Sequence, residues 1–188
     1  MLKELIQKNR SYRRFHEEVT IGRETLLELV DLARLSASSG NLQPLKYLLA
    51  DSAYMTQKIF PHLQWAGYLT DWPGPAEGER PTAYIVILHD TTITKTVNCD
   101  QGIAAQSILL GATKRGLGGC IIASINKDEL QKTLKIPEHL QILLVIALGK
   151  PNEKIKIDEI DSEDDIKYWR DDRGIHHVPK RKLKDIIL

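Results

Sequence analysis

A continuous apolar run at Ala83–Leu88 constrains the fold more than any other segment of this chain. Its residues, Ala-Tyr-Ile-Val-Ile-Leu, are rich in β-branched side chains and are not interrupted by polar ones. A half-exposed strand alternates apolar and polar residues, so an unbroken run predicts a strand that is covered on both faces. The sequence therefore predicts a layered fold in which other elements cover both sides of a central sheet.

The segment Asp100–Arg115 predicts a buried helix. Apolar residues surround most of its circumference, which is typical of a helix at the centre of a fold or in a subunit interface. Lys114 and Arg115 complement its carboxyl end, and Gly116 suits the left-handed residue that follows a helix. Periodicity and capping residues predict further helices near 2–6, 24–35, 52–60 and 126–135, and further strands at 46–50, 120–125 and 141–148.

Length and composition indicate one domain over residues 1–188. The 188 residues, 42% of them hydrophobic, suffice for one sizeable core. Residues 151–188 are polar and charged without an apolar period, which predicts an extended tail that lies on the body or on a partner subunit. Lys and Arg number 26 against 25 Asp and Glu, so no overall field favours nucleic acid or an anionic membrane as a partner.

Cysteine usage and hydropathy favour a cytoplasmic protein. Cys99 and Cys120 form no CxxC pair and no disulfide framework, as expected in a reducing compartment. No stretch approaches the roughly 20 apolar residues of a membrane span, and no signal peptide is apparent. The six histidines lack metal-ligand spacing, so we expect no metal site.

The polar run from Asn9 to Phe15 carries the first candidate site residues. Arg10 and Arg13 provide fork-shaped cationic donors and Ser11 a hydroxyl donor, a set that suits a terminal phosphate dianion. The alternative is that the arginines only complement the carboxyl end of the preceding helix.

A second polar run, Ser38–Pro44, follows one predicted helix later. Its amides and hydroxyls suit the edge of a polar heterocycle, and the alternative is an ordinary loop at a helix end. The candidate ligands in this run are Ser38, Asn41 and Gln43.

Three further features bear on function. The glycines in Gly116–Gly119 superficially resemble a dinucleotide fingerprint, but that motif needs a strand before it and a helix after it, and here the order is reversed. We expect these glycines to end the helix and to bring backbone close to something flat. Cys120 is interpreted as a small buried hydrophobe. The excursion Trp65–Pro75 either forms the wall of a ligand slot or is an Ω-loop packed on its own aromatic residues.

Four segments, in order along the chain, resemble the motifs of the nitroreductase family of homodimeric FMN-dependent oxidoreductases. The family's phosphate motif, approximately R-R-S-x-R-x-F, corresponds to Asn9–Phe15, and its motif A-P-S-x-x-N-x-Q-P-W corresponds to Ser36–Leu45. Its alanine-rich helix, which ends in G-L-G and a strand, corresponds to Asp100–Ser124. Its strand ending in L-G-x-P corresponds to Leu148–Pro151, followed by the late basic pair Lys180-Arg181.

The resemblance implies an α+β, nitroreductase-like fold with a central mixed β-sheet flanked by helices, and a homodimer with FMN sites at the interface. It also implies which residues bind the cofactor. The FMN phosphate would be bound by Arg10, Ser11 and Arg13, joined from the tail by Lys180 or Arg181. The isoalloxazine pyrimidine edge would be bound by Ser38, Asn41 and Gln43, which this family typically takes from the partner subunit. Backbone N–H groups of Ala123 or Ser124, in the segment Ile122-Ala123-Ser124, would lie near flavin N5 and O4.

The implied activity is the reduction of nitroaromatics, quinones or related acceptors with NADH or NADPH. Kinetics would be ping-pong, because nicotinamide and the small-molecule acceptor share one open slot, and no catalytic side chain is expected because the flavin carries the chemistry. The chain departs from the family pattern at Asn9, Ala37 and Leu45 and at Ala123-Ser124, which leaves the substrate class open.

Three alternatives remain from the sequence. The first is an FMN-binding protein without turnover, and the second is a specialised relative that cleaves flavin or dehalogenates. The third is a non-flavin module with a phosphate pocket, which leaves the segment with Asn41 and Gln43 without a role.

Overall fold

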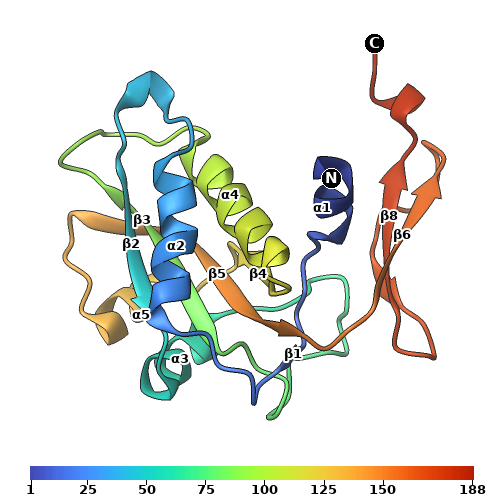
Figure 1. Ribbon diagram of the computed structural model, residues 1–188, viewed down its shortest axis with the longest axis horizontal. Helices are drawn as coiled ribbons and strands as arrows, with labels where there is room; N and C mark the ends of the chain where they lie inside the picture. The colour runs from blue at the N-terminus through green and yellow to red at the C-terminus, as the bar shows by residue number, and fades with distance from the viewer.

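The structure is a computed structural model that describes residues 1–188 (Figure 1). Its main sheet has the strand order β1-β5-β3-β2, and β4 pairs with the edge of β5 that faces away from β3. All four pairings between these strands are antiparallel. The bounds are β1 (Phe15–His16), β2 (Leu45–Ala50), β3 (Ala83–Asp90), β4 (Gly118–Ile122) and β5 (Leu140–Pro151).

Helices cover both faces of this sheet, as the apolar run in β3 predicts. Every residue of β3 is buried, and successive side chains point to opposite faces. Ile85 and Ile87 pack in a core with α2 (Arg23–Arg34) and α4 (Asp100–Lys114). Tyr84 and Val86 pack in a second core, to which α3 (Ala53–Ile59) and α5 (Lys127–Leu134) contribute. The remaining helices are α1 (Leu2–Lys8) and the short 3₁₀ helices η1 (Ser39–Asn41), η2 (Phe60–His62) and η3 (Leu183–Asp185).

Helix α4 is less enclosed than its composition predicts. Ala105 and Ile108 are fully buried in the core against α2 and the sheet. Gly102, Ile103 and Gln106 form an exposed stripe, and the Ile103 side chain is 37% exposed. One chain therefore covers most of this helix but leaves an apolar residue on its outer face.

Element ends differ from the sequence predictions where pairing or capping overrides local signals. Asn126 precedes α5, but its side chain makes no capping hydrogen bond. Strand β5 runs through Gly149 to Pro151 because β1 pairs with its last two residues, Lys150 and Pro151. Ser52 caps α3, since its hydroxyl accepts a hydrogen bond from the backbone N–H of Met55 at 3.4 Å.

The residues after β5 form a three-stranded sheet of their own. Its strands are β6 (Ile155–Ile160), β7 (Trp169–Arg170) and β8 (His176–Arg181), in the order β6-β8-β7. We call this unit the tail sheet; β6 and β8 are parallel, and β7 is antiparallel to β8. It stands beside α1 and apart from the main sheet (Figure 1). The predicted tail is thus extended in backbone, but its strands pair with one another.

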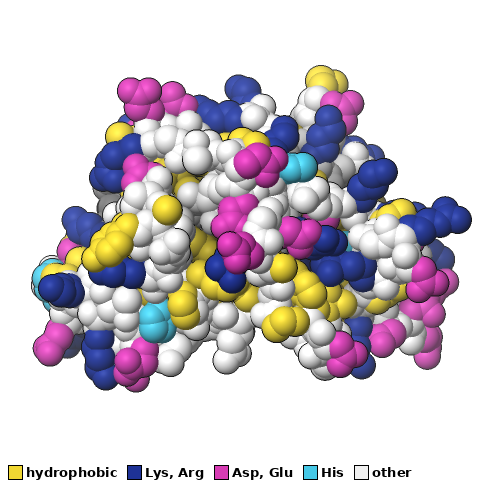
Figure 2. Space-filling model, turned by 90° about the horizontal axis from the view of Figure 1, so that it is seen from below, with side chains coloured by type: hydrophobic (Ala, Val, Ile, Leu, Met, Phe, Trp, Pro, Cys, Tyr) yellow, Lys and Arg dark blue, Asp and Glu magenta, His cyan; other side chains and the backbone are white.

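The surface carries both signs of charge in close mixture. Figure 2 shows Lys and Arg side chains interspersed with Asp and Glu over the face seen from below, in line with the nearly balanced composition. None of the helices combines the length and the hydropathy that a membrane crossing requires.

Candidate functional site

The first polar segment lies between α1 and β1, along the edge of β4. Ser11 forms a parallel bridge with Gly119, and the backbone N–H of Tyr12 donates to the carbonyl oxygen of Gly119 at 3.0 Å. A Cβ on Gly118 would lie 2.5 Å from a ring carbon of Tyr12, so only glycine admits the ring there. The flat group that the glycines approach is therefore this tyrosine, and the contact fixes the segment that contains Arg10 and Arg13.

Four of the predicted phosphate ligands line one pocket of about 290 Å³. They are Arg10, Ser11, Arg13 and Lys180, and we call this the cationic pocket. Lys180 shares its side of β8 with Val178 and His176, which also line the pocket. Arg181 does not line it, because successive side chains of a strand point to opposite faces.

Arg10 combines the two roles that its position in the sequence leaves open. Its guanidinium donates to the carbonyl oxygens of Ile6 at 2.9 Å and Asn9 at 2.6 Å, and so completes the carboxyl end of α1. The same side chain lines the cationic pocket. Burial lowers the pKa of Arg10 below its usual value, and the guanidinium remains cationic at neutral pH.

Arg13 joins the first segment to the tail sheet. Its side chain is only 9% exposed, and its guanidinium lies 4.8 Å from the ring centre of Tyr168. Its Nη1 donates to the carbonyl oxygen of Ser11 at 3.2 Å and lies 3.3 Å from Nε2 of His176. Arg13 is therefore held in place by groups on both sides of the pocket, and its position does not resemble that of a surface residue at a helix end.

Arg14 has a different partner and faces away from this pocket. Its guanidinium forms an ion pair with the carboxylate of Glu79, and its Nε donates to that carboxylate at 2.7 Å. The hydrogen bond from Arg14 lowers the pKa of Glu79 below its usual range. Arg14 therefore does not supply the charge that Asn9 removes from the phosphate motif.

Glu153 is the hub that connects the first segment, the end of β5 and the tail sheet. Its side chain is 1% exposed, and its carboxylate accepts from the backbone N–H groups of Arg13 at 2.5 Å and Arg14 at 3.3 Å. The same carboxylate pairs with Nη2 of Arg170 in β7 at 3.3 Å. No pattern in the sequence singles out this carboxylate.

A second pocket of about 230 Å³ adjoins the cationic pocket and shares Arg13, Ile121 and Tyr168 with it. The candidate residues Ile122, Ala123 and Ser124 line it, and we call it the strand-end pocket. Ala123 and Ser124 are exposed, and their backbone N–H groups take part in none of the chain's backbone hydrogen bonds. They are free to donate to a ligand.

The aromatic excursion forms the opposite wall of the strand-end pocket. Trp65, Ala66 and Gly67 line it, and the backbone N–H of Gln64 donates to the carbonyl oxygen of Ser124 at 3.0 Å. The ring of Trp65 also packs on Phe60, with centroids 6.0 Å apart. The start of the excursion therefore forms a wall of this pocket, while its Trp65 ring packs on Phe60, which lies outside the excursion.

The second polar segment lies elsewhere on the same chain. Its loop includes η1, at the end of the fold where α2 passes into β2 (Figure 1), and none of Ser38, Asn41 and Gln43 lines either pocket. Ser38 and Gln43 instead line a separate pocket of about 150 Å³. A single chain therefore does not bring the two polar segments together.

Interactions within this loop hold an unusual backbone conformation. Gly40, Asn41 and Gln43 have φ values of 56°, 54° and 53°, and the left-handed region is uncommon for glutamine. The Ser38 hydroxyl donates to the Asp100 carboxylate at 2.5 Å and accepts from the backbone N–H of Gln43 at 2.9 Å. Ser38 thus shapes the loop, while the side chains of Asn41 and Gln43 are exposed.

The sequence profile described as the Nitroreductase family matches residues 6–71 and 77–150 of the chain. The chain belongs to the nitroreductase family. Among curated proteins it is 23% identical to "Putative NAD(P)H nitroreductase YodC" of Bacillus subtilis, over 78% of this chain and 88% of that protein.

Solved structures share the fold of this chain. It is similar to the NADPH:FMN oxidoreductase of Vibrio harveyi complexed with NAD⁺, with a TM-score of 0.61, 25% identity, and 80% of this chain and 69% of that chain covered. It is also similar to an FMN complex from Exiguobacterium sibiricum, with a TM-score of 0.67, 17% identity, and 81% and 89% covered. The α+β nitroreductase fold that the sequence motifs imply is confirmed.

Proposed function

We propose that this nitroreductase is an FMN-dependent oxidoreductase that reduces nitroaromatics, quinones or related conjugated acceptors with NADH or NADPH. The observation that carries the proposal is the cationic pocket, where Arg10, Ser11, Arg13 and Lys180 meet beside the strand-end pocket. The likeness to the Vibrio harveyi and Exiguobacterium sibiricum structures supports FMN as the ligand. Both cysteines, the exposed Cys99 and the buried Cys120, are free thiols, which supports a location in the reducing cytoplasm.

The donor groups of the two pockets fit FMN. A phosphate in the cationic pocket would meet three cationic side chains, and each charge-assisted hydrogen bond would contribute about 1.5–3 kcal/mol. His176 lines the same pocket, and its Nδ1 is buried without a partner, as expected if a ligand supplies the acceptor. The free backbone N–H groups of Ala123 and Ser124 would donate to the isoalloxazine ring. FMN, when bound, supplies the hydride and electron chemistry, so the protein needs no catalytic side chain.

The proposal includes a homodimer with the FMN sites at its interface. Asn41 and Gln43 are exposed and line neither pocket of their own chain, so only a second copy would bring them to the flavin. Exposed apolar side chains surround the loop that carries them and support an interface there. They are Leu32 and Leu35 at the end of α2, Leu42 beside η1, and Ile103 on α4.

The purified protein should be yellow and contain about one FMN per chain. It should oxidise NADH or NADPH in steady state when menadione or nitrofurazone is added as acceptor. A colourless protein that does not quench the fluorescence of added FMN would overturn the proposal. Bound FMN without turnover on any acceptor would instead favour the alternatives of a non-turnover flavoprotein or a specialised relative.

Replacing Ile103 by glutamate should dissociate the dimer without unfolding the chain. In a monomer, Ile103 is 37% exposed on the outer face of α4, so a charge there would remain in contact with water. In a dimer, the same charge would be buried in an apolar interface, which would destabilise the association. Ala105→Glu should unfold the protein outright, since Ala105 is fully buried in its own core. Light scattering at micromolar concentration and thermal melting separate the two results, with Gln57→Glu on the exposed face of α3 as control. A wild-type monomer that retains FMN would contradict the dimer.

Initial rates over a grid of both substrates should give parallel double-reciprocal lines. Nicotinamide and acceptor would occupy one slot in turn, which predicts ping-pong kinetics. Gln43→Leu should slow the reductive half-reaction more than it weakens nicotinamide binding, because its amide would stabilise negative charge on the reduced cofactor. Intersecting lines would indicate a ternary complex and a wider site.

A further inference from the structure

His176 is a buried polar residue in the wall of the cationic pocket, and one of its ring nitrogens lacks a hydrogen-bond partner. Its side chain is 1% exposed and belongs to β8, where it lines the cationic pocket with Val178 and Lys180. Nδ1 of its ring is buried and has no hydrogen-bond partner in the chain. Buried polar groups are nearly always paired, so an unpaired one that borders a pocket indicates a missing ligand.

The partner on the other side of the ring fixes the tautomer. Nη1 of Arg13 lies 3.3 Å from Nε2 of His176, and a guanidinium has only donors. Nε2 must therefore accept, and the single ring proton of a neutral imidazole resides on Nδ1. His176 thus presents an N–H donor that no group of the chain accepts.

The charges around His176 keep it neutral. Burial, and then the positive charges of Arg13 and Arg170, lower the pKa of His176 to about 4. The ring of Tyr168 packs against it with centroids 5.2 Å apart, and Lys180 adds a further cation to the same pocket. The carboxylate of Glu153 pairs with Arg170 and accepts from the backbone of Arg13 and Arg14, and it makes no hydrogen bond with the His176 ring.

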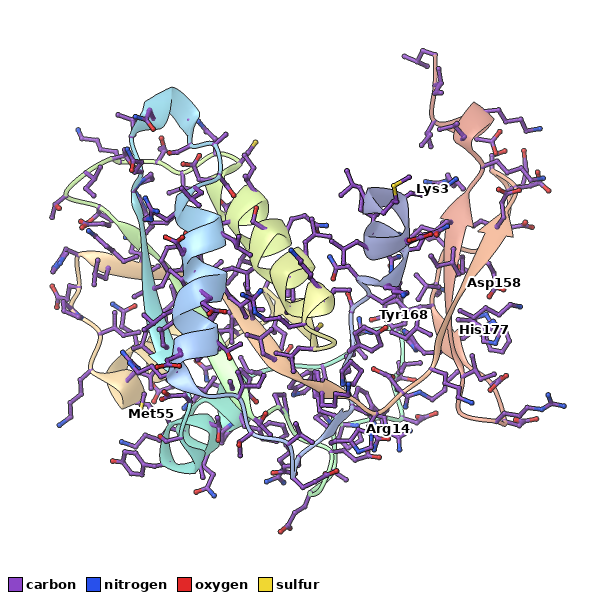
Figure 3. All side chains as sticks on the ribbon, viewed as in Figure 1. Lys3, Arg14, Met55, Asp158, Tyr168 and His177 are labelled. Carbon is purple, nitrogen blue, oxygen red and sulfur yellow. The ribbon has the colours of Figure 1, made fainter.

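The neighbouring His177, in the same strand, has a partner for each of its ring nitrogens. Its Nδ1 lies 2.5 Å from a carboxylate oxygen of Asp158, and its Nε2 lies 3.5 Å from one of Asp171. Its ring stacks on Trp169 with centroids 4.0 Å apart. Figure 3 shows His177 and Asp158 on the side of the tail sheet turned away from α1, whereas Tyr168 lies on the side that faces it. His177 has a structural role, and His176 has one free donor.

We propose that His176 is a neutral hydrogen-bond donor to the FMN phosphate through its Nδ1–H group, and that it selects phosphorylated flavin over riboflavin. The proposal rests on the proposed function, since it takes FMN as the ligand of the cationic pocket. Arg10, Arg13 and Lys180 already supply more positive charge than a phosphate dianion carries. A neutral donor adds a directional hydrogen bond without a fourth cation next to Arg13.

Two substitutions at His176 separate this role from packing. His176→Phe keeps a ring but removes the donor and the acceptor, and should weaken FMN binding about 10-fold or more while riboflavin binding changes less than about 2-fold. His176→Gln offers an amide oxygen to Arg13 and an N–H to the phosphate, and should restore most of the FMN affinity. His177→Gln is the matched control on the opposite face of β8, and it should leave the ratio of the two dissociation constants unchanged.

Nitrogen NMR of the wild-type protein tests the donor directly. With ¹⁵N-labelled histidine at pH 7, His176 should show a protonated Nδ1 and an unprotonated Nε2, and its Nδ1–H resonance should move when FMN or inorganic phosphate is added but not when riboflavin is added. The role of His176 would be overturned if His176→Phe weakened FMN and riboflavin binding equally, or if the Nδ1–H resonance did not move on addition of FMN or inorganic phosphate. Either result would leave the proposed function standing. A wild-type protein that binds no FMN would overturn both.

Discussion

Replacing Arg13 by glutamate should abolish tight FMN binding and affect riboflavin binding far less. Arg13 lines both pockets and is 9% exposed, so its charge acts in a partly dehydrated site. The substitution deletes a contact of about 1.5–3 kcal/mol, or roughly 10- to 150-fold in affinity, and adds a carboxylate that repels the phosphate. Fluorescence quenching gives both dissociation constants, and their ratio is the quantity that should change.

Two matched variants control for damage to the fold. Arg13→Gln removes the charge without adding repulsion, and should give a smaller loss in the same direction. Arg14→Gln removes the same charge from the adjacent residue, which is paired with Glu79 outside the pocket, and should leave the ratio unchanged. If Arg13→Glu weakens FMN and riboflavin binding equally, then Arg13 has only a structural role.

The sequence predicts the central layers well, because the signals there are local. The unbroken apolar run of β3 and the periodicity of α2 each follow from neighbouring residues that share one environment. The signal in the tail sheet is weaker. β6 begins with a short apolar and polar alternation, but β7 has only two residues, and both strands form by pairing with β8, which comes later in the chain.

The same distinction applies to the candidate site. Donor chemistry alone picks out Arg10, Ser11 and Arg13, and the structure brings them together. The choice between Lys180 and Arg181 depends on strand register, which residue types do not encode. His176 and Glu153 escape the sequence analysis because their contacts with Arg13 span 163 and 140 residues.

Replacing Glu153 by alanine should cost about 3–5 kcal/mol of the free energy of unfolding, the range for removing one partner of a buried ion pair. Its side chain is 1% exposed, and its loss leaves the Arg170 side chain, which is 18% exposed, without its charge partner. It also leaves the backbone N–H groups of Arg13 and Arg14 without their acceptor. Urea denaturation at pH 7 measures the effect, and Glu163→Ala, on the exposed surface of the tail, should change stability by less than about 0.5 kcal/mol.

The consequence for binding should differ from that of Arg13→Glu. Because Glu153 connects the backbone of Arg13 and Arg14 to Arg170 in β7, its removal should release the tail sheet, and with it Tyr168, His176 and Lys180 from the pocket walls. Limited proteolysis should then cut the chain within residues 154–188 while the main sheet stays resistant. FMN affinity should fall through loss of three wall residues at once, and Glu153→Gln, which keeps an acceptor oxygen, should retain part of it. Full stability in Glu153→Ala would show that the tail sheet docks without this carboxylate, through the contacts of Arg13 with Tyr168 and His176.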